Sequence, residues 1–204
     1  MINTVNELNI IIVGVGGQGV VLISDILGRA AVREGINVVG SEVLGMAQRG
    51  GSVFSNIRFG SNAYAPLTPE GRCDILVTLE PSEALRNIQY LNKSSMVIMN
   101  THEVIPSSVS LGLSTYPKIK QITDKLNTLV GRVIIFDAVE LAEKAGNSLS
   151  TNMVMLGALF GSGQIPIKIE TVKALIKESF SAKAAIVNDK AFDFGYDICS
   201  GMRK

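Results

Sequence analysis

The sequence predicts an α/β protein with a Rossmann-like, mostly parallel sheet, helices on both faces of that sheet and a helical C-terminal region. Three observations predict it. Short apolar runs alternate with segments of helical periodicity, a glycine-rich turn joins the first run to the first helix, and the final quarter of the chain reads as helices. With 204 residues, we expect a single domain over 1–204, whose helical C-terminal part begins near residue 151.

The first half of the chain supplies strands and one clear helix. Leu8–Val13 is an almost continuous apolar run, as in a strand that is buried on both faces. Gln18–Glu34 follows with an apolar stripe at helical spacing, and Gly35 ends it. The next strands are expected at Ile36–Val39, Val53–Phe59 and Asp74–Leu79.

The second half continues the alternation and then becomes helical. Pro81 suits the first turn of a helix after the preceding strand. Further strands are expected at Met96–Met99 and Val133–Phe136. Strands separated by helices favour right-handed crossovers and a largely parallel sheet. The C-terminal helices are expected at Asn152–Phe160, Glu170–Phe180 and Lys183–Cys199.

Composition excludes several classes of partner. With 19 Lys and Arg against 18 Asp and Glu, the net charge is +1, which gives no electrostatic reason to bind nucleic acid or an anionic membrane. Only 18% of residues are charged and 47% are hydrophobic, so we expect another subunit to cover part of the surface. The first residues do not follow the order of a signal peptide and no uncharged run suits a membrane span, so we expect a cytoplasmic location.

The segment LNIIIVGVGGQG, residues 8–19, carries the first candidate site, which we call the glycine turn. Gly14 and Gly16 allow a tight turn and a close backbone approach, and the free N–H groups at the start of the helix can bind an anion. A tight turn between a strand and a helix needs glycines even where it binds nothing. The alternative that these glycines only form the turn therefore stays open. The candidate contacts for a phosphate group or a partner are Gly14, Gly16, Gly17, Gln18 and Gly19.

An ordinary dinucleotide or metal site is not indicated. A dinucleotide site needs an acidic residue at the end of the second strand. Glu42 is near that place, but it is the first residue of a motif that continues with Gly45, Gln48 and Arg49, and this motif is not a simple strand end. The chain also lacks a P-loop lysine. GVGGQG is similar to the turn of enzymes that adenylate ubiquitin-like proteins, but their acidic pair and zinc cysteines are missing here. Cys73 and Cys199 stand far apart, so no metal site is expected.

Glycine and polar residues follow the predicted strands at the carboxyl edge of the sheet, where ligands and partners of such sheets bind. We call this set the rim. Its glycines expose the backbone, Met46 offers an apolar contact and Arg49 a planar fork for a carboxylate or phosphate. Alternatively, the polar residues of these loops only cap helices. His102 is expected to be a loop residue. The sequence shows no set of nucleophile, base and acid, so we assign no catalytic residue. The rim residues are Glu42, Gly45, Met46, Gln48, Arg49, Gly50, Gly51, Ser52, Glu80, Asn100 and Thr101.

Four stretches of the sequence resemble a known family. They are NIIIVGVGGQGVVLISDILGRAAVREG, SEVLGMAQRGGSVFSNIRFG, LEPSEALRNIQYL and TNMVMLGAL. They are similar to the β subunit of indolepyruvate:ferredoxin oxidoreductase and, more broadly, to the γ domain of 2-oxoacid:ferredoxin oxidoreductases. The pairing of G-x-G-G-Q-G with S-E-V-x-G-M-A-Q-R-G-G is the most specific part. The likeness runs from about Leu8 to Gly195 and is weakest around Ser107–Asn127.

The resemblance implies an activity that is divided between chains. The family oxidatively decarboxylates 2-oxoacids with thiamine diphosphate, Mg²⁺ and iron–sulfur clusters, reduces ferredoxin and transfers the acyl group to coenzyme A. The indolepyruvate branch uses arylpyruvates. Because this chain has no Gly-Asp motif and only two isolated cysteines, no cofactor is expected on it, and those cofactors are expected on a larger α subunit, with two copies of each subunit.

This chain would then complete the complex without holding a cofactor. The resemblance implies that the glycine turn and the rim dock near the thiamine site of the α subunit and help to shape the coenzyme A route. We expect a homodimer as one state of the isolated chain. Two alternatives stay open: a γ subunit that serves pyruvate, 2-oxoglutarate or a branched-chain oxoacid, and a stand-alone Rossmann module that binds a nucleotide.

Overall fold

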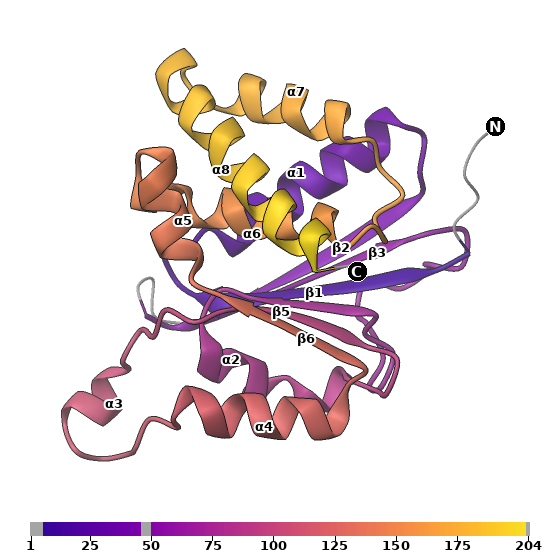
Figure 1. The fold of residues 1–204 in the computed structure, drawn as a ribbon. Helices are drawn as coiled ribbons and strands as arrows, with labels where there is room; N and C mark the ends of the chain where they lie inside the picture. The colour runs from indigo at the N-terminus through magenta and orange to yellow at the C-terminus, as the bar shows by residue number, and fades with distance from the viewer. Residues whose placement is uncertain (1–5, 46–49, 203–204) are drawn as a thin grey trace.

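The structure, a computed structural model, describes residues 6–45 and 50–202 and confirms the predicted α/β architecture. One six-stranded sheet, in the order β2-β3-β1-β4-β5-β6, lies between two layers of helices (Figure 1). The strands are β1 (Leu8–Val15), β2 (Val38–Leu44), β3 (Ser52–Phe59), β4 (Ile75–Thr78), β5 (Met96–Asn100) and β6 (Arg132–Phe136).

Helices cover the two faces unequally. One face carries α1 (Val20–Arg33), α5 (Ala138–Ala145), η2 (Ser148–Ser150), α6 (Thr151–Gly161), α7 (Ile169–Ser179) and α8 (Ala182–Gly201). The other carries α2 (Pro81–Arg86), η1 (Ile88–Tyr90) and α4 (Ile119–Leu129). The short helix α3 (Ser107–Ser110) lies on a loop that projects from the body (Figure 1). Among the described residues, no helix has both the length and the apolar character needed to cross a bilayer.

The sheet is mostly parallel, with one exception. Strands β1, β4, β5 and β6 pair in parallel, whereas β3 lies antiparallel between β2 and β1. The predicted second strand, Ile36–Val39, was placed too early, because Ser41 and Glu42 lie inside β2 and not in a loop. An edge strand such as β2 is held by its backbone ladder with β3 and needs no run of apolar side chains, which explains the misplacement.

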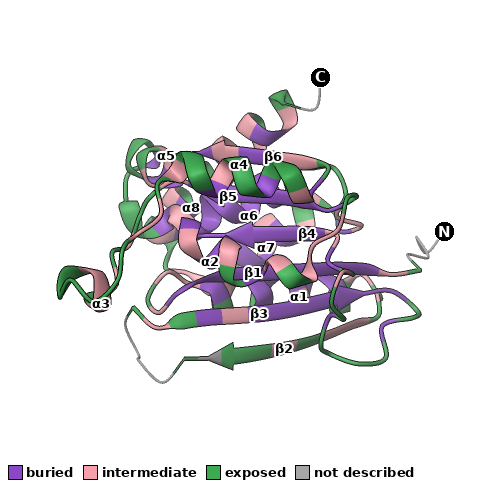
Figure 2. Ribbon diagram, turned by 90° about the horizontal axis from the view of Figure 1, so that it is seen from below, coloured by how far each residue is buried: buried purple, intermediate pink, exposed green. Residues whose placement is uncertain are grey.

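The buried residues of β1 divide between two cores, because successive side chains of a strand point to opposite faces. Ile10 and Ile12 face α1 and the C-terminal helices, whereas Ile11 and Val13 face α2 and α4. All of Leu8–Val15 is buried, as predicted for a strand covered on both sides. Figure 2 shows the same contrast across the sheet: the inner strands are buried, whereas β2 at the edge is largely exposed.

Helices α6 and α8 pack closely enough for their backbones to touch. A Cβ atom on Gly157 would collide with the carbonyl oxygen of Phe192, and one on Gly195 would collide with that of Val154. Glycine is therefore required on both helices at this crossing. Every residue of α6 from Asn152 to Gly161 is buried, so α6 is the central helix of its layer.

Candidate functional site

The glycine turn and the hairpin between β2 and β3 meet at the carboxyl end of β1. The Gly16 N–H donates to the Gly51 carbonyl (2.8 Å), and the Gly50 N–H donates to the Gly16 carbonyl (3.4 Å). These bonds extend the ladder between β1 and β3, which ends with Val15 opposite Ser52. Two sequence motifs thus form one continuous backbone surface. Of the rim residues, Met46, Gln48 and Arg49 lie outside the described residues.

Gln18 closes the glycine turn from within. Its Oε1 atom accepts a hydrogen bond from the Val15 N–H (2.8 Å), and its Nε2 atom donates to the Leu79 carbonyl (3.2 Å). A Cβ atom on Gly14 would lie 2.7 Å from that Oε1 atom, so Gly14 makes room for the glutamine. The Gln18 side chain therefore joins β1 to the end of β4, and both ends of its amide are engaged within the chain.

Gly19 and Asn152 meet where α1 begins. Gly19 has φ +80°, in the left-handed region that favours glycine, and supplies no side-chain cap to α1. A Cβ atom on Gly19 would collide with the Nδ2 atom of Asn152, which lies in the first turn of α6. The Oδ1 atom of Asn152 is buried and has no hydrogen-bond partner within residues 6–45 and 50–202. Sequence reasoning missed Asn152, whose only signal was its place in the stretch TNMVMLGAL.

Glu80 lies beneath the rim surface, not on it. Its side chain is 1% exposed and caps α2, where one carboxylate oxygen accepts from Ser82 Oγ (2.6 Å) and from the Glu83 N–H (3.2 Å). The other oxygen accepts from the Tyr116 hydroxyl, and burial is the main reason why the pKa of Tyr116 is raised above its usual range. Glu80 thus fastens the projecting loop that carries α3 to the start of α2.

Asn100 is also a brace beneath the rim. Its side chain is completely buried; the Nδ2 atom donates to the Leu79 carbonyl (3.0 Å) and the Oδ1 atom accepts from the Ala138 N–H (2.9 Å). It therefore ties the ends of β4 and β5 to the start of α5. The next residue, Thr101, donates its N–H to the Phe136 carbonyl (3.0 Å) and is half-buried, while His102 is exposed.

Ser52 and Gly45 hold the hairpin in place. The Gly45 N–H donates to the Ser52 carbonyl (2.9 Å), and a Cβ atom on Gly45 would lie 2.6 Å from that oxygen. The Ser52 hydroxyl donates to Glu83 Oε2 (2.6 Å), and Arg86 pairs with the other carboxylate oxygen (3.2 Å). Burial raises the pKa of the Glu83 carboxyl, and the Ser52 bond opposes the rise. Sequence reasoning missed Glu83, which anchors the rim to α2.

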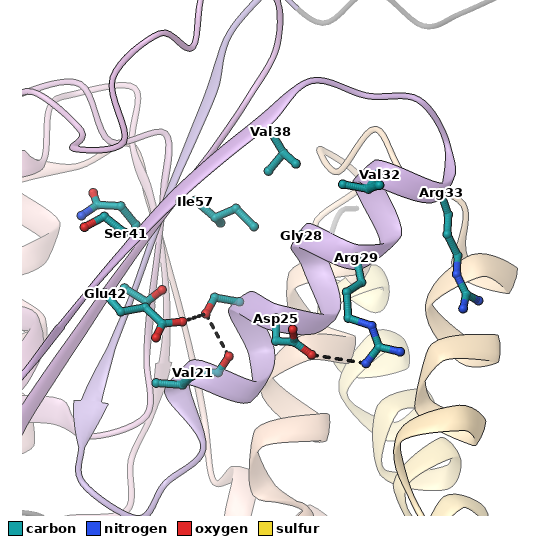
Figure 3. A pocket seen from close by; sticks show the side chains of 14 residues that line it. Val21, Asp25, Gly28, Arg29, Val32, Arg33, Val38, Ser41, Glu42 and Ile57 are labelled. Atoms are coloured by element: carbon teal, nitrogen blue, oxygen red, sulfur yellow. Dashed lines mark hydrogen bonds and ion pairs between the residues drawn. The ribbon is translucent and has the colours of Figure 1, made fainter.

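A groove of about 930 Å³ runs beside the rim, between α1 and the strands β2 and β3 (Figure 3). Glu42 lies in this groove, where its carboxylate accepts from Ser24 Oγ (3.0 Å). Asp25 pairs with Arg29 in the groove (3.3 Å; Figure 3). Arg33 donates to the Glu178 carboxylate on α7 (2.8 Å). The other lining residues are Val21, Gly28, Val32, Val38, Gly40, Ser41, Ser55, Asn56 and Ile57.

This arrangement differs from a dinucleotide site. In dinucleotide-binding folds the second strand lies beside the first and ends in the acidic residue that binds the ribose. Here β3 occupies the place beside β1, and Glu42 on β2 faces the groove along α1. The chain therefore keeps the glycine turn without the strand that would complete a ribose site.

The side chains of this chain do not fit the cofactors that the resemblance implies. An iron–sulfur cluster takes grouped thiolates, but the sequence has only two cysteines, both of them buried, and burial raises the pKa of Cys73 to about 12. The described ranges gather no group of three His, Cys, Asp or Glu side chains around one point. The sequence also lacks the Gly-Asp pair that would hold Mg²⁺ and thiamine diphosphate.

Residues 9–198 match the protein family described as pyruvate ferredoxin/flavodoxin oxidoreductase. This chain belongs to that family. It is 48% identical over 191 residues to the indolepyruvate oxidoreductase subunit IorB of Archaeoglobus fulgidus, over 94% of both chains. It is 27% identical to the pyruvate/ketoisovalerate oxidoreductases common subunit gamma of Thermococcus kodakarensis, over 90% of this chain and 92% of that protein. The resemblance read from the sequence is confirmed.

A solved structure supports the same fold. The 2-oxoglutarate:ferredoxin oxidoreductase from Magnetococcus marinus, with 2-oxoglutarate, coenzyme A and succinyl-CoA bound, matches with a TM-score of 0.72 and 19% sequence identity. The match covers 97% of this chain and 32% of that one. The fold seen here thus forms about a third of a larger polypeptide in that enzyme.

Proposed function

We propose that this chain is the small subunit of an indolepyruvate oxidoreductase and works with a larger subunit that holds thiamine diphosphate, Mg²⁺ and iron–sulfur clusters. Identity supports the substrate branch, at 48% to an indolepyruvate oxidoreductase subunit against 27% to a pyruvate/ketoisovalerate subunit. Two separate, buried cysteines support placing the clusters on the partner. Two copies of each subunit would form the complex.

The joined backbone of Gly16, Gly50 and Gly51 is the observation that carries this proposal. Gly17 and Gly50 are exposed and have no atom within 4 Å of the place where a Cβ atom would stand. A surface without side chains lets the main chain of a partner approach closely. Docked on the larger subunit, it excludes water from that subunit's reaction site, which is the contribution to the reaction that we assign to this chain.

The start of α1 supports a second part of the proposal, a contact with a phosphate group of coenzyme A. The first turn of α1 has no side-chain cap, and the positive end of a helix favours an anion. The unpaired Oδ1 atom of Asn152 lies beside this turn and offers an acceptor to a donor on the incoming ligand or partner. The related Magnetococcus marinus enzyme was solved with coenzyme A bound.

A matched pair of glycine variants tests the docking surface. Gly50 and Gly71 have φ of +74° and +68° and no atom within 4 Å of an added Cβ, so tryptophan strains both backbones alike. In the complex with the larger subunit, we expect Gly50→Trp to lower assembly or turnover at least tenfold, or to raise the KM for coenzyme A. Gly71→Trp should change none of these. Equal behaviour of the two variants would rule out the rim as the docking surface.

Assays of the purified complex test the substrate and the competing functions. With a low-potential electron acceptor and coenzyme A, indolepyruvate should give a higher kcat/KM than pyruvate, 2-oxoglutarate or a branched-chain oxoacid. A preference for another oxoacid would reassign the substrate branch within the family. Titration of the isolated chain with NAD(H) and NADP(H) should show no tight binding, and tight binding would favour the stand-alone nucleotide module.

A further inference from the structure

The loop between β5 and α4 projects from the body of the protein (Figure 1). We call residues 104–116 of this loop, VIPSSVSLGLSTY, the arm; it contains no charged residue. None of its apolar side chains belongs to either core, and Leu111 and Leu113 are 73% and 77% exposed. The arm therefore presents apolar area that the chain itself does not cover, which is typical of an interaction site.

Hydrogen bonds within the arm give it a defined shape. The Leu111 N–H donates to the Ser107 carbonyl (2.9 Å), and the Leu113 N–H donates to the Ser108 carbonyl (2.8 Å). The hydroxyl oxygens of Ser108 and Ser114 lie 2.9 Å apart. Both leucines thus stand on an ordered turn, and a partner that buries them has less conformational freedom to remove than it would on an unstructured loop.

One buried carboxylate closes the arm at its base. Glu80 Oε1 accepts from the Val104 N–H (3.4 Å) and from the Tyr116 hydroxyl, so it binds both ends of the arm. Glu80 caps α2, and Glu83, in the first turn of that helix, accepts from the Ser52 hydroxyl (2.6 Å). A single helical turn therefore fixes the arm relative to the hairpin that carries the exposed glycines.

We propose that the arm is a second contact for the larger subunit, in which its leucines enter an apolar pocket. This inference rests on the proposed function. In both Figure 1 and Figure 2 the arm projects from the side of the body at which β2 ends, so a subunit seated on Gly50 and Gly51 faces the arm as well. Those glycines let a main chain approach but have no side chain to bury. Leu111 and Leu113 supply the apolar area that the glycine surface lacks.

The composition and position of the arm disfavour other occupants. Because it has no Lys or Arg, it offers no charge to a nucleic acid or an anionic membrane. A second copy docked on the arm would occupy the side of the body that the larger subunit needs. Composition and geometry therefore both favour the larger subunit as the occupant.

A double substitution in the arm tests the contact. Leu111→Ser combined with Leu113→Ser removes no buried side chain, so the variant should keep the melting temperature of the wild type. We expect it to bind the larger subunit about tenfold more weakly, or weaker still, in isothermal titration calorimetry, because apolar burial is lost. Val32→Ser is the control. Val32 is 69% exposed but lies at the end of α1 remote from the glycine turn, so its substitution should leave the affinity unchanged.

Limited proteolysis of the wild-type chain tests whether the arm is covered. Chymotrypsin should cut after Leu111 or Leu113 in the chain alone, and the larger subunit should slow this cut about tenfold or more. Tyr64 is 86% exposed and follows β3 at the end of that strand remote from the hairpin, so the cut after Tyr64 should proceed at the same rate with and without the larger subunit. Equal cutting of the arm in the chain alone and in the complex would overturn the inference.

Further outcomes separate this inference from the proposed function. If Gly50→Trp weakens assembly but the double variant binds like the wild type, the arm contact is wrong and the docking surface stands. If the wild-type chain does not bind the larger subunit at all, the proposed function itself is wrong. Self-association of the chain, or binding to phosphatidylglycerol vesicles, that the double variant abolishes would assign the arm to a second copy or to a membrane, and would overturn the inference.

Discussion

Between α6 and α8, glycines let two helices touch backbone to backbone, whereas in the glycine turn and the hairpin they leave the backbone open to the outside. Gly157 and Gly195 have ordinary helical backbones, and a Cβ atom on either would collide with a carbonyl oxygen of the other helix. Gly17 and Gly50 have φ of +99° and +74° and open space around them. The first pair is needed because of its neighbours, and the second because of its own backbone conformation.

The difference separates residues that maintain stability from residues that are free to make a contact. A side chain added between α6 and α8 would force a well-packed core apart. A side chain added at Gly17 meets no atom within 4 Å and costs only the left-handed backbone conformation. Substitutions of one kind, glycine to alanine, therefore distinguish the two regions.

The largest effect is expected for Gly195→Ala. The added methyl group collides with the Val154 carbonyl, so we expect the free energy of unfolding to fall by about 3 kcal/mol, at the upper end of overpacking. Urea unfolding of the full chain measures it. Gly201→Ala, at the exposed end of the same helix with no atom within 4 Å, should change the free energy of unfolding by no more than about 0.5 kcal/mol. Similar stabilities for the two variants would show that α6 and α8 can separate without cost.

Gly17→Ala should have a smaller effect on stability and a separate effect on assembly. The left-handed backbone conformation costs an alanine about 1–2 kcal/mol, and no clash is added. Gly35→Ala, with φ +69° and open space at the turn between α1 and β2, should lose the same stability. Only Gly17→Ala should also weaken binding of the larger subunit. If both variants lower the affinity equally, the glycine turn has no special part in recognition.

The smallest effect concerns Glu83 and the dependence of stability on pH. Burial raises its folded pKa above the unfolded value of 4.5, so the folded chain binds the proton more tightly than the unfolded chain. Its contribution to stability is therefore fully present below pH 4.5 and is lost as the pH rises through the folded pKa. Glu83→Gln should make the free energy of unfolding depend less on pH across this window. Glu143→Gln, at an exposed position, should leave that dependence unchanged. Parallel pH curves for Glu83→Gln and the wild type would contradict this.

The alternation of strands and helices was readable in the sequence, but the antiparallel place of β3 was not read from it. The composition of Val53–Phe59 suits a strand in parallel pairing as well as one in antiparallel pairing. The observed strand ends leave only residues 45–51 between β2 and β3, too few for the crossover that two adjacent parallel strands need. The predicted end at Val39 left residues 40–52, which are enough, so the antiparallel pairing could not be read from the length. Gly40, Ser41 and Glu42 concealed the end of β2 because an edge strand does not require apolar side chains.

The sequence also indicated which motifs lie together, but not which polar residues support them from below. The glycine turn and the hairpin were expected at the same edge, and hydrogen bonds between Gly16 and Gly51 join them. Glu80 and Asn100 stood at the same strand ends in the sequence, yet they are buried braces. A polar residue after a strand looks the same whether it caps a helix or faces outward. Asn152 reaches Gly19 only once α6 has packed on the sheet.

The insertion of β3 between β2 and β1 affects how the chain can assemble itself. Strands β2 and β3 are joined by a short connection. They can therefore pair as soon as both have been synthesised, before the residues that follow β3 have been made. The parallel pairing of β1 with β4 closes a much longer loop and must form later. The hairpin would then reach β1 as a preformed ribbon, and β2 would stay unpaired on the nascent polypeptide only until β3 has been synthesised.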